Sequence, residues 1–173
     1  MTSTPAPPPR HALYAGSFDP LTLGHMDLIH RGLTLFDQVT VAVARNINKR
    51  PLLSFEERVE LIERAFAQEL RVRVAPLPEG LLVRFARDLG AQALLRGLRG
   101  AADLEYEQQL ASMNRALAPE VESVFLMSSE RHRFVSSSLV RDVALNGGDV
   151  RPFVPEGVAE ALAARLASGR GAS

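Results

Sequence analysis

The sequence contains no cysteine in its 173 residues. This absence excludes disulfide bonds, thiolate metal sites and a cysteine nucleophile, and it is typical of a cytoplasmic protein. The sequence also lacks an apolar run long enough to cross a bilayer. Its charges cancel, with 20 Lys and Arg residues against 20 Asp and Glu residues, so nothing at this level indicates a nucleic-acid or membrane partner. We therefore expect a cytoplasmic protein whose cationic patches are local.

Two familiar nucleotide-binding loops are absent as well. Neither Gly-x-x-x-x-Gly-Lys-Ser/Thr nor Gly-x-Gly-x-x-Gly occurs, which argues against P-loop kinases and ordinary dehydrogenases. The chain has instead a small-residue loop from Gly16 to His25, between a strand-like apolar run at 11–15 and a helical pattern. Gly16 and Gly24 have no Cβ, so backbone N–H groups can approach a ligand, and a helix N-terminus favours an anion. The loop predicts a nucleotide-phosphate site at which His25 takes part.

Apolar, β-branched runs alternate with helical patterns along the whole chain. Parallel strands need crossover connections, and helices between strands supply them. We predict an α/β fold: a doubly wound, Rossmann-like, five-stranded parallel sheet with helices on both faces, in a single domain. The expected strands, each interpreted as buried, cover residues 11–15, 39–44, 72–75, 93–95 and 124–127, and the expected helices cover 26–36, 55–66, 82–89, 106–117, 137–146 and 155–167.

Local signals mark several of these helices. Ser54 with Glu57 predicts a capping box at the start of the second helix, and Gly90 is expected to follow the end of the third. The fourth helix carries an apolar stripe that we expect to face the core, formed by Tyr106, Leu110, Met113 and Leu117.

The two ends of the chain are expected to lie outside the folded domain. Residues 1–10 are proline-rich and lack the apolar stretch of a signal peptide, so we interpret them as a disordered tail. Residues 169–173 are interpreted as a frayed C-terminus. The domain itself is expected to cover residues 11–168.

Cationic and hydroxyl side chains follow several of the predicted strands. Because ligands of open α/β sheets bind beyond the carboxyl ends of the strands, these loops are expected to meet at one edge. A fork-shaped guanidinium suits phosphate oxygens, and a serine-rich helix start can cap the helix and bind an anion. The pattern predicts a small polyanionic partner such as a nucleoside triphosphate, bound by His25, Lys49, Arg50, Arg96, Arg99, Arg131, Arg133 and the serines 136–138.

Several of these residues also have an ordinary structural interpretation. Lys49 and Arg50 are equally consistent with a solvated pair of loop charges. By spacing alone, Glu105 and Glu107 belong to a solvated helix face. Asp19 is interpreted as a turn-forming residue and not as a catalytic base.

The motif Thr22-Leu23-Gly24-His25 resembles the His-x-Gly-His type signature of a nucleotidyltransferase superfamily, with threonine in the first position. The resemblance narrows to one family, the bacterial pantetheine-phosphate adenylyltransferases, and covers residues 11–166. The stretches that carry it are Tyr14–Pro20, Leu94–Arg99, Asp103–Glu107, Met113–Arg115 and Phe134–Arg141. The sequence departs from the family pattern at His132, where an aromatic residue is common, and at 46–48.

The resemblance implies a reaction and a set of contacts. ATP and 4′-phosphopantetheine would give dephospho-coenzyme A and pyrophosphate. Mg²⁺ would arrive with ATP, and no metal ligand in the protein can be named. The resemblance also implies a homohexamer. Contacts to phosphopantetheine are implied for Ser17, Lys49, Leu82 and Arg96. Contacts to ATP are implied for Ser17, Phe18, His25, Gly97, Leu98, Arg99, Glu107, His132, Arg133, Phe134, Val135, Ser136, Ser137 and Ser138.

Such a reaction needs no nucleophile from the protein, because the substrate phosphate attacks directly. We assign Lys49 and Arg96 to the attacking phosphate, and Arg99, the serine-rich helix start and Mg²⁺ to the triphosphate. His25 is the expected transition-state stabiliser, donating a hydrogen bond to the α-phosphate. Two alternatives remain open: transfer to another phosphorylated acceptor, such as nicotinamide mononucleotide or glycerol 3-phosphate, and a non-catalytic nucleotide-sensing module.

Overall fold

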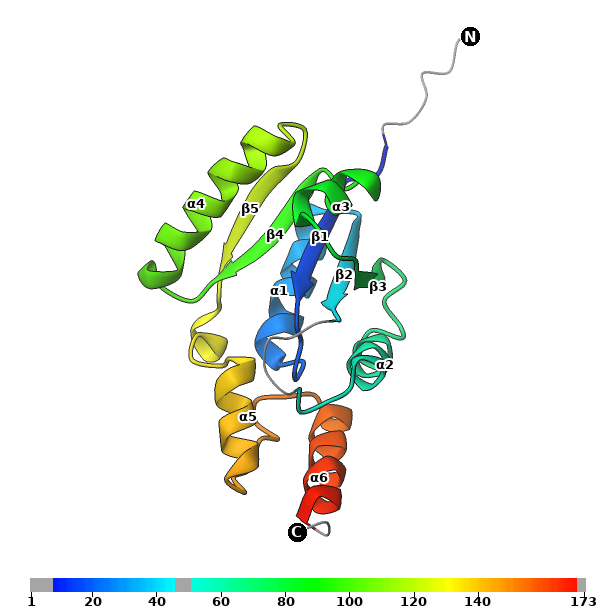
Figure 1. The fold of residues 1–173 in the computed structure, drawn as a ribbon, viewed down its shortest axis with the longest axis vertical. Helices are drawn as coiled ribbons and strands as arrows, with labels where there is room; N and C mark the ends of the chain where they lie inside the picture. The colour runs from blue at the N-terminus through cyan, green and yellow to red at the C-terminus, as the bar shows by residue number, and fades with distance from the viewer. Residues whose placement is uncertain (1–7, 46–50, 171–173) are drawn as a thin grey trace.

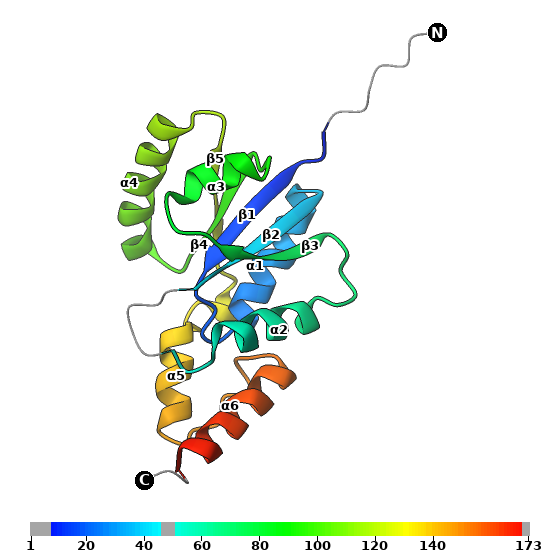
Figure 2. The ribbon, with the colours of Figure 1, turned by 45° about the vertical axis from the view of Figure 1, so that its right-hand side comes forward.

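The computed structural model describes residues 8–45 and 51–170, so Lys49 and Arg50 lie outside the described residues. One parallel sheet runs in the order β3-β2-β1-β4-β5, as Figures 1 and 2 show. This is the predicted doubly wound arrangement. The strands are β1 (His11–Gly16), β2 (Gln38–Ala44), β3 (Val72–Leu77), β4 (Ala93–Leu98) and β5 (Glu122–Met127).

Helices connect consecutive strands, and α5 and α6 follow the last strand. In Figure 1, α5 and α6 lie beyond the carboxyl edge of the sheet, and α4 lies beside β4 and β5. None of the helices in the described part of the chain is long and apolar enough to span a membrane. The helices are α1 (Leu23–Leu35), α2 (Phe55–Ala65), α3 (Leu82–Asp88), α4 (Ala101–Leu117), the short η1 (Glu130–His132), α5 (Ser137–Leu145) and α6 (Glu156–Arg170).

The two faces of the sheet bury two separate cores because neighbouring strand residues point to opposite sides. Ala12 and Tyr14 of β1 belong to the larger core, which packs against α1, α2, α5 and α6. Leu13, between them, belongs to the smaller core, which includes Val83 and Ala86 of α3. Helices therefore cover both faces, as predicted.

Local capping signals formed as the sequence indicated. The Ser54 hydroxyl accepts from the Glu57 N–H at 3.1 Å, and the Glu57 carboxylate accepts from the Ser54 N–H at 2.6 Å. Gly90 follows the end of α3 with a φ of +71°, which favours glycine.

Two predictions about burial were wrong. The edge strands β3 and β5 contain no fully buried residue, because each has a neighbour on only one side. Helix α4 also buries no residue, and Tyr106 and Met113 of the predicted core stripe are 63% and 64% exposed. The apolar spacing of α4 was real, but no element in the described part of the chain covers Tyr106 and Met113.

Some element boundaries also differ from the prediction. Strand β4 continues through Leu98, so Arg96 and Gly97 lie in a strand and not in the loop that follows it. Helix α6 extends to Arg170, into the stretch interpreted as frayed. Arg10, in the predicted tail, forms an ion pair with Asp37 at 2.9 Å.

Asp19 anchors the loop between β1 and α1. Its carboxylate accepts from the N–H groups of Leu52 at 2.8 Å and Leu53 at 2.9 Å, and it pairs with Arg141 at 3.1 Å. The side chain is 4% exposed, so these partners replace water. Asp19 does more than form a turn, because it ties the loop to α5 and to the segment before α2.

Replacing Asp19 with alanine should destabilise the fold strongly. The change leaves Arg141 and two buried N–H groups without this acceptor, which typically costs about 3–5 kcal/mol in the free energy of unfolding. Urea unfolding followed by circular dichroism measures the loss. The matched control is Asp37→Ala, which breaks an exposed ion pair with Arg10 and should leave the free energy of unfolding close to the wild-type value. Equal losses in the two variants would contradict this account of Asp19.

Candidate active site

A cleft opens where β1 and β4 separate. The β1–β4 ladder contains only the pairs Ala12–Ala93 and Leu13–Leu94, whereas β1 pairs with β2 as far as Gly16. Beyond these pairs the two strands diverge, at the point where the strand order changes direction. The resulting cavity has a volume of about 330 Å³.

The N-terminus of α1 fixes the orientation of His25 in this cleft. Thr22 is the N-cap, and its hydroxyl lies 3.3 Å from the His25 backbone N–H, which donates to it. In return, the Thr22 backbone N–H donates to Nδ1 of the His25 imidazole at 3.1 Å. A backbone N–H can only donate, so Nδ1 accepts and the proton of the neutral ring sits on Nε2. The Nε2–H group is therefore the donor left for a ligand.

The surroundings of His25 keep the imidazole neutral. Burial, and secondly the charge of Arg99, lower the pKa of His25 from 6.5 to about 4. The ring lies against two aromatic rings, 5.1 Å from Phe18 and 6.2 Å from Tyr14 between centroids. At physiological pH the site thus offers an uncharged hydrogen-bond donor of fixed direction.

Two arginines enter the cleft already paired with carboxylates of α4. Arg96 makes a bidentate pair with Glu107, at 2.9 Å from Nε and 2.6 Å from Nη2, and this partner raises the pKa of Arg96. Arg99 donates its backbone N–H to Asp103 at 3.0 Å and its Nε at 3.2 Å; these bonds lower the pKa of Asp103. Glu107 is thus no solvated face residue, because its side chain is 12% exposed and holds Arg96 in place.

The start of α5 forms the opposite wall. Ser136 is the N-cap, and its hydroxyl accepts from the Leu139 N–H at 3.2 Å. Ser137 donates to the Pro20 carbonyl at 2.8 Å, which joins this wall to the loop after β1. Ser136, Ser137 and Ser138 at this helix start line the cleft.

The structure brings together most, but not all, of the residues predicted for the site. Leu82 instead packs against the smaller core, Leu98 is buried, and Arg133 and Phe134 do not line the cleft. Lys49 falls outside the described residues. The predicted residues that do line the cleft are Ser17, Phe18, His25, Arg96, Gly97, Arg99, Glu107, His132, Val135, Ser136, Ser137 and Ser138.

Other lining residues were not predicted as site residues, among them Tyr14, Thr22, Leu28, Asp103 and Ser128. Thr22 had a signal in the sequence, because a threonine three residues before a polar side chain is a capping-box pattern, although histidine replaces the usual Glu or Gln. Asp103 had one too, as it lies four residues after Arg99 at ion-pair spacing.

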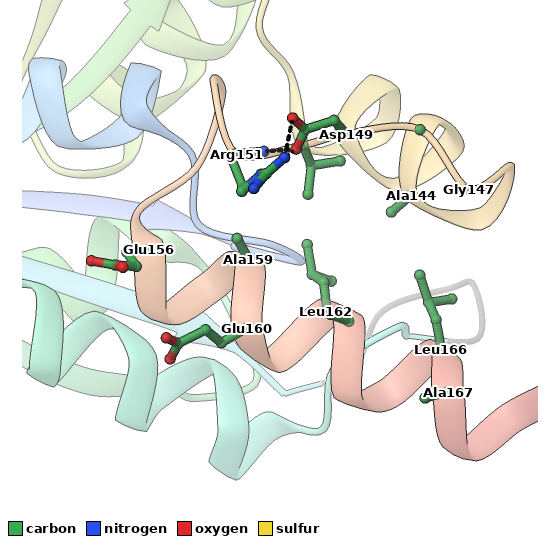
Figure 3. Close-up of a pocket in the computed structure, with 13 residues that line it drawn as sticks. Ala144, Gly147, Asp149, Arg151, Glu156, Ala159, Glu160, Leu162, Leu166 and Ala167 are labelled. Atoms are coloured by element: carbon green, nitrogen blue, oxygen red, sulfur yellow. Dashed lines mark hydrogen bonds and ion pairs between the residues drawn. The ribbon is translucent and has the colours of Figure 1, made fainter.

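A larger cavity of about 640 Å³ lies between α5 and α6 (Figure 3). Apolar side chains of α6, including Leu162 and Leu166, point into it, and its labelled charged residues include an ion pair between Asp149 and Arg151. It contains none of the predicted site residues. Size alone therefore does not identify the active site, and most of the predicted site residues line the smaller cleft at β1 and β4 instead.

The described residues include no group of three or more His, Asp or Glu side chains placed to hold a metal ion. The two acidic residues of the cleft, Asp103 and Glu107, are both engaged by arginines. A metal in this cleft would therefore have to be held largely by oxygens of the bound substrate and by water.

Residues 13–143 match a family described as cytidylyltransferase-like. Among solved structures, a putative nicotinate-nucleotide adenylyltransferase from Vibrio parahaemolyticus superposes with a TM-score of 0.69 at 17% identity, covering 91% of this chain and 94% of that one. This likeness confirms the fold. The chain belongs to the cytidylyltransferase-like family, a class of nucleotidyltransferases.

Two relatives that are similar over nearly the full length of the chain define its family within this class. A phosphopantetheine adenylyltransferase of Desulfotalea psychrophila is 52% identical over 155 residues, which is 89% of this chain and 91% of that protein. The enzyme of the same name from Caulobacter vibrioides is 48% identical over 163 residues, 92% of this chain and 99% of that protein. Within the class, the chain belongs to the phosphopantetheine adenylyltransferases.

The tautomer and charge of His25 can be measured directly. We expect ¹⁵N NMR of the folded chain to show a neutral ring with the proton on Nε2, which protonates only near the pKa of about 4. In the unfolded chain the ring protonates near 6.5, so the unfolded state binds more protons between these values. The contribution of His25 to stability is therefore complete above pH 6.5 and is lost as the pH falls toward 4. A charged ring at pH 6, or a proton on Nδ1, would contradict the geometry.

Proposed function

We propose that this chain transfers the adenylyl group of ATP to 4′-phosphopantetheine, giving dephospho-coenzyme A and pyrophosphate in coenzyme A biosynthesis. One observation carries the proposal. An imidazole of fixed tautomer lines the same cleft as Arg96, Arg99 and the start of α5. The names of the full-length relatives indicate the acceptor, since both are phosphopantetheine adenylyltransferases.

In this reaction the acceptor phosphate attacks the α-phosphorus of ATP and pyrophosphate leaves. The Nε2–H of His25 donates to an α-phosphate oxygen, and this bond strengthens as negative charge builds in the transition state. A neutral Nε2–H group suits this role, because it stabilises the developing charge by a hydrogen bond without transferring its proton. His25 therefore needs no reprotonation between turnovers. Alignment and charge stabilisation, and not covalent catalysis, supply the rate.

The cations of the cleft bind the two anions. Arg96 uses two of its five N–H groups on Glu107, which leaves three for the attacking phosphate. Lys49 is assigned to the same phosphate. Arg99 and the first turn of α5 bind the triphosphate, with Ser17, Phe18 and His132 lining the same cleft. The carboxylates beside both arginines keep the guanidinium planes in one orientation before substrate arrives.

Three further parts of the proposal concern the setting of the enzyme. Mg²⁺ would be bound together with ATP, where it would help to neutralise the charge of the triphosphate, and the described side chains form no cluster that would hold it. The chain forms a homohexamer, for which the exposed apolar face of α4, including Tyr106 and Met113, supplies a contact surface. The protein acts in the cytoplasm on small molecules, without nucleic-acid or membrane partners.

Pyrophosphate release tests the function and the role of His25 together. The wild-type chain should release pyrophosphate from ATP only when phosphopantetheine is present. His25→Ala should lower kcat by about 10²–10³ while ATP binding weakens far less, because the lost bond acts in the transition state. The control is His30→Ala, which removes an exposed imidazole from the same helix.

Release with nicotinamide mononucleotide or glycerol 3-phosphate, but not with phosphopantetheine, would replace the proposed acceptor. ATP binding without release on any acceptor would instead favour a nucleotide sensor. Turnover of His25→Ala within a few-fold of wild type would remove His25 from its role.

Lys49 can be tested on its own. Lys49→Ala should raise the KM for phosphopantetheine roughly tenfold or more, since a charged hydrogen bond to the phosphate is lost. The KM for ATP, measured in the same assay, serves as the internal control and should stay close to the wild-type value. An unchanged KM for phosphopantetheine would exclude Lys49 from the site.

A further inference from the structure

Arg58 is the most deeply buried charged side chain in the part of the chain that the structure describes, with 1% of its surface exposed. It lies one turn into α2 and is absent from the cleft lining. Its guanidinium donates to three backbone carbonyls, those of Ser17, Ala44 and Ser54. Burial lowers the pKa of Arg58, so the fold disfavours the charge it retains. Removing this cation from water costs free energy, which the hydrogen bonds to three carbonyls and the contact with the Phe55 ring, 5.7 Å from the guanidinium carbon, offset in part.

Two of the three carbonyls that Arg58 binds, those of Ser17 and Ala44, lie where the pairing of β1 with β2 ends. The ladder between β1 and β2 ends at the pair Gly16–Val43. Ser17 follows the end of β1 and Ala44 is the last residue of β2. A single nitrogen of Arg58, Nη1, lies 2.6 Å from the Ser17 carbonyl and 2.9 Å from the Ala44 carbonyl. The two N–H groups of Nη1 therefore continue the connection between the strands after the ladder has ended. A lysine ammonium could donate to both carbonyls, but it lacks the Nε–H that Arg58 donates to the Ser54 carbonyl at 3.3 Å, so its direction would be less fixed.

The Ser17 end of this connection leads directly to His25. Ser17 lines the cleft, and the next residue, Phe18, is buried with a φ of +49°, an uncommon conformation for a residue with a large side chain. The Phe18 ring packs edge-on against the His25 imidazole at 5.1 Å. A shift of the Ser17 carbonyl would therefore move the ring that supports the imidazole.

The Ala44 end of this connection lies where the chain leaves β2. Arg45 follows Ala44, and its guanidinium lies over the Phe55 ring at 4.2 Å from the centroid. Phe55 is the first residue of α2, so the first turn of this helix holds the chain as it leaves β2 through both Arg58 and Phe55. In the sequence, Lys49 follows only a few residues later.

We propose that Arg58 is a positioning residue for adenylyl transfer, which fixes the Ser17–Phe18 turn at a set distance from the end of β2. This inference rests on the proposed function, because it concerns the alignment that the reaction requires. Arg58 touches neither substrate. It acts through the backbone that carries Ser17 and through the ring of Phe18, and its loss should reduce alignment more than binding. A misplacement of about 1 Å in reacting groups typically costs about 10²-fold in rate.

The test compares Arg58→Lys with a matched control. Arg165→Lys makes the same chemical change at an arginine of α6 whose Nε donates to the Leu52 carbonyl at 3.2 Å and which does not line the cleft. Pyrophosphate release gives kcat and KM, and thermal unfolding gives Tm. We expect kcat of Arg58→Lys to fall about 10- to 100-fold, with both KM values within about threefold of wild type. The control should retain its kcat even where its Tm falls.

Arg58→Met serves where Arg58→Lys does not fold, because it removes the buried charge and keeps the apolar volume. It should lose at least as much kcat. Wild-type kcat in either folded variant overturns the proposal, as does a kcat loss no larger than that of Arg165→Lys. Absence of pyrophosphate release in the wild-type chain would overturn the proposed function instead, so the two failures are distinguishable.

Discussion

The short pairing of β1 with β4 is the constraint on which the rest of the site depends. Two residue pairs join these strands, and beyond Leu13 and Leu94 they diverge. Because all five strands are parallel, the divergence opens at the carboxyl edge, where the loop after β1, the end of β4 and the start of α5 lie together. A longer ladder would close the cleft.

Within the cleft, the charges are balanced before any substrate binds. Arg96 and Arg99 are each paired with a carboxylate of α4, and the imidazole between them and α5 is neutral. Among the described residues the cleft is less cationic than the sequence indicated, since Arg131 and Arg133 do not line it. Hydrogen-bond partners hold the His25, Arg96 and Arg99 side chains in fixed orientations. In the proposed reaction, donors held in this way would stabilise the charge that develops in the transition state.

The sequence predicts the features that depend on neighbours in the chain. Strand runs, the capping box of Ser54 and the C-terminal glycine of α3 are local patterns, and the structure shows each of them. The edge of the sheet that holds the site also follows from the alternation of strands and helices. Motif resemblance then supplies the individual residues, most of which line the cleft.

What the sequence does not reveal are partners that are distant in the chain. Spacing does not identify the partners of Asp19, which are the N–H groups of Leu52 and Leu53, 33 and 34 residues away. Nor does it identify the two strand ends that Arg58 joins. The exposure of α4 escapes prediction for a related reason. Periodicity indicates which side of a helix is apolar, but not whether another element covers it. His25 is an intermediate case, because its cap at Thr22 is local but uses histidine where Glu or Gln is usual.

A crystal structure of the chain with a non-reactive ATP analogue and phosphopantetheine would test the central claim most directly. The account predicts that both ligands occupy the cleft between β1 and β4, with an oxygen of the α-phosphate within hydrogen-bond distance of Nε2 of His25 and the triphosphate at the start of α5. It is contradicted if the nucleotide lies elsewhere, for example between α5 and α6, or if Nδ1 of His25 leaves Thr22 to bind the phosphate.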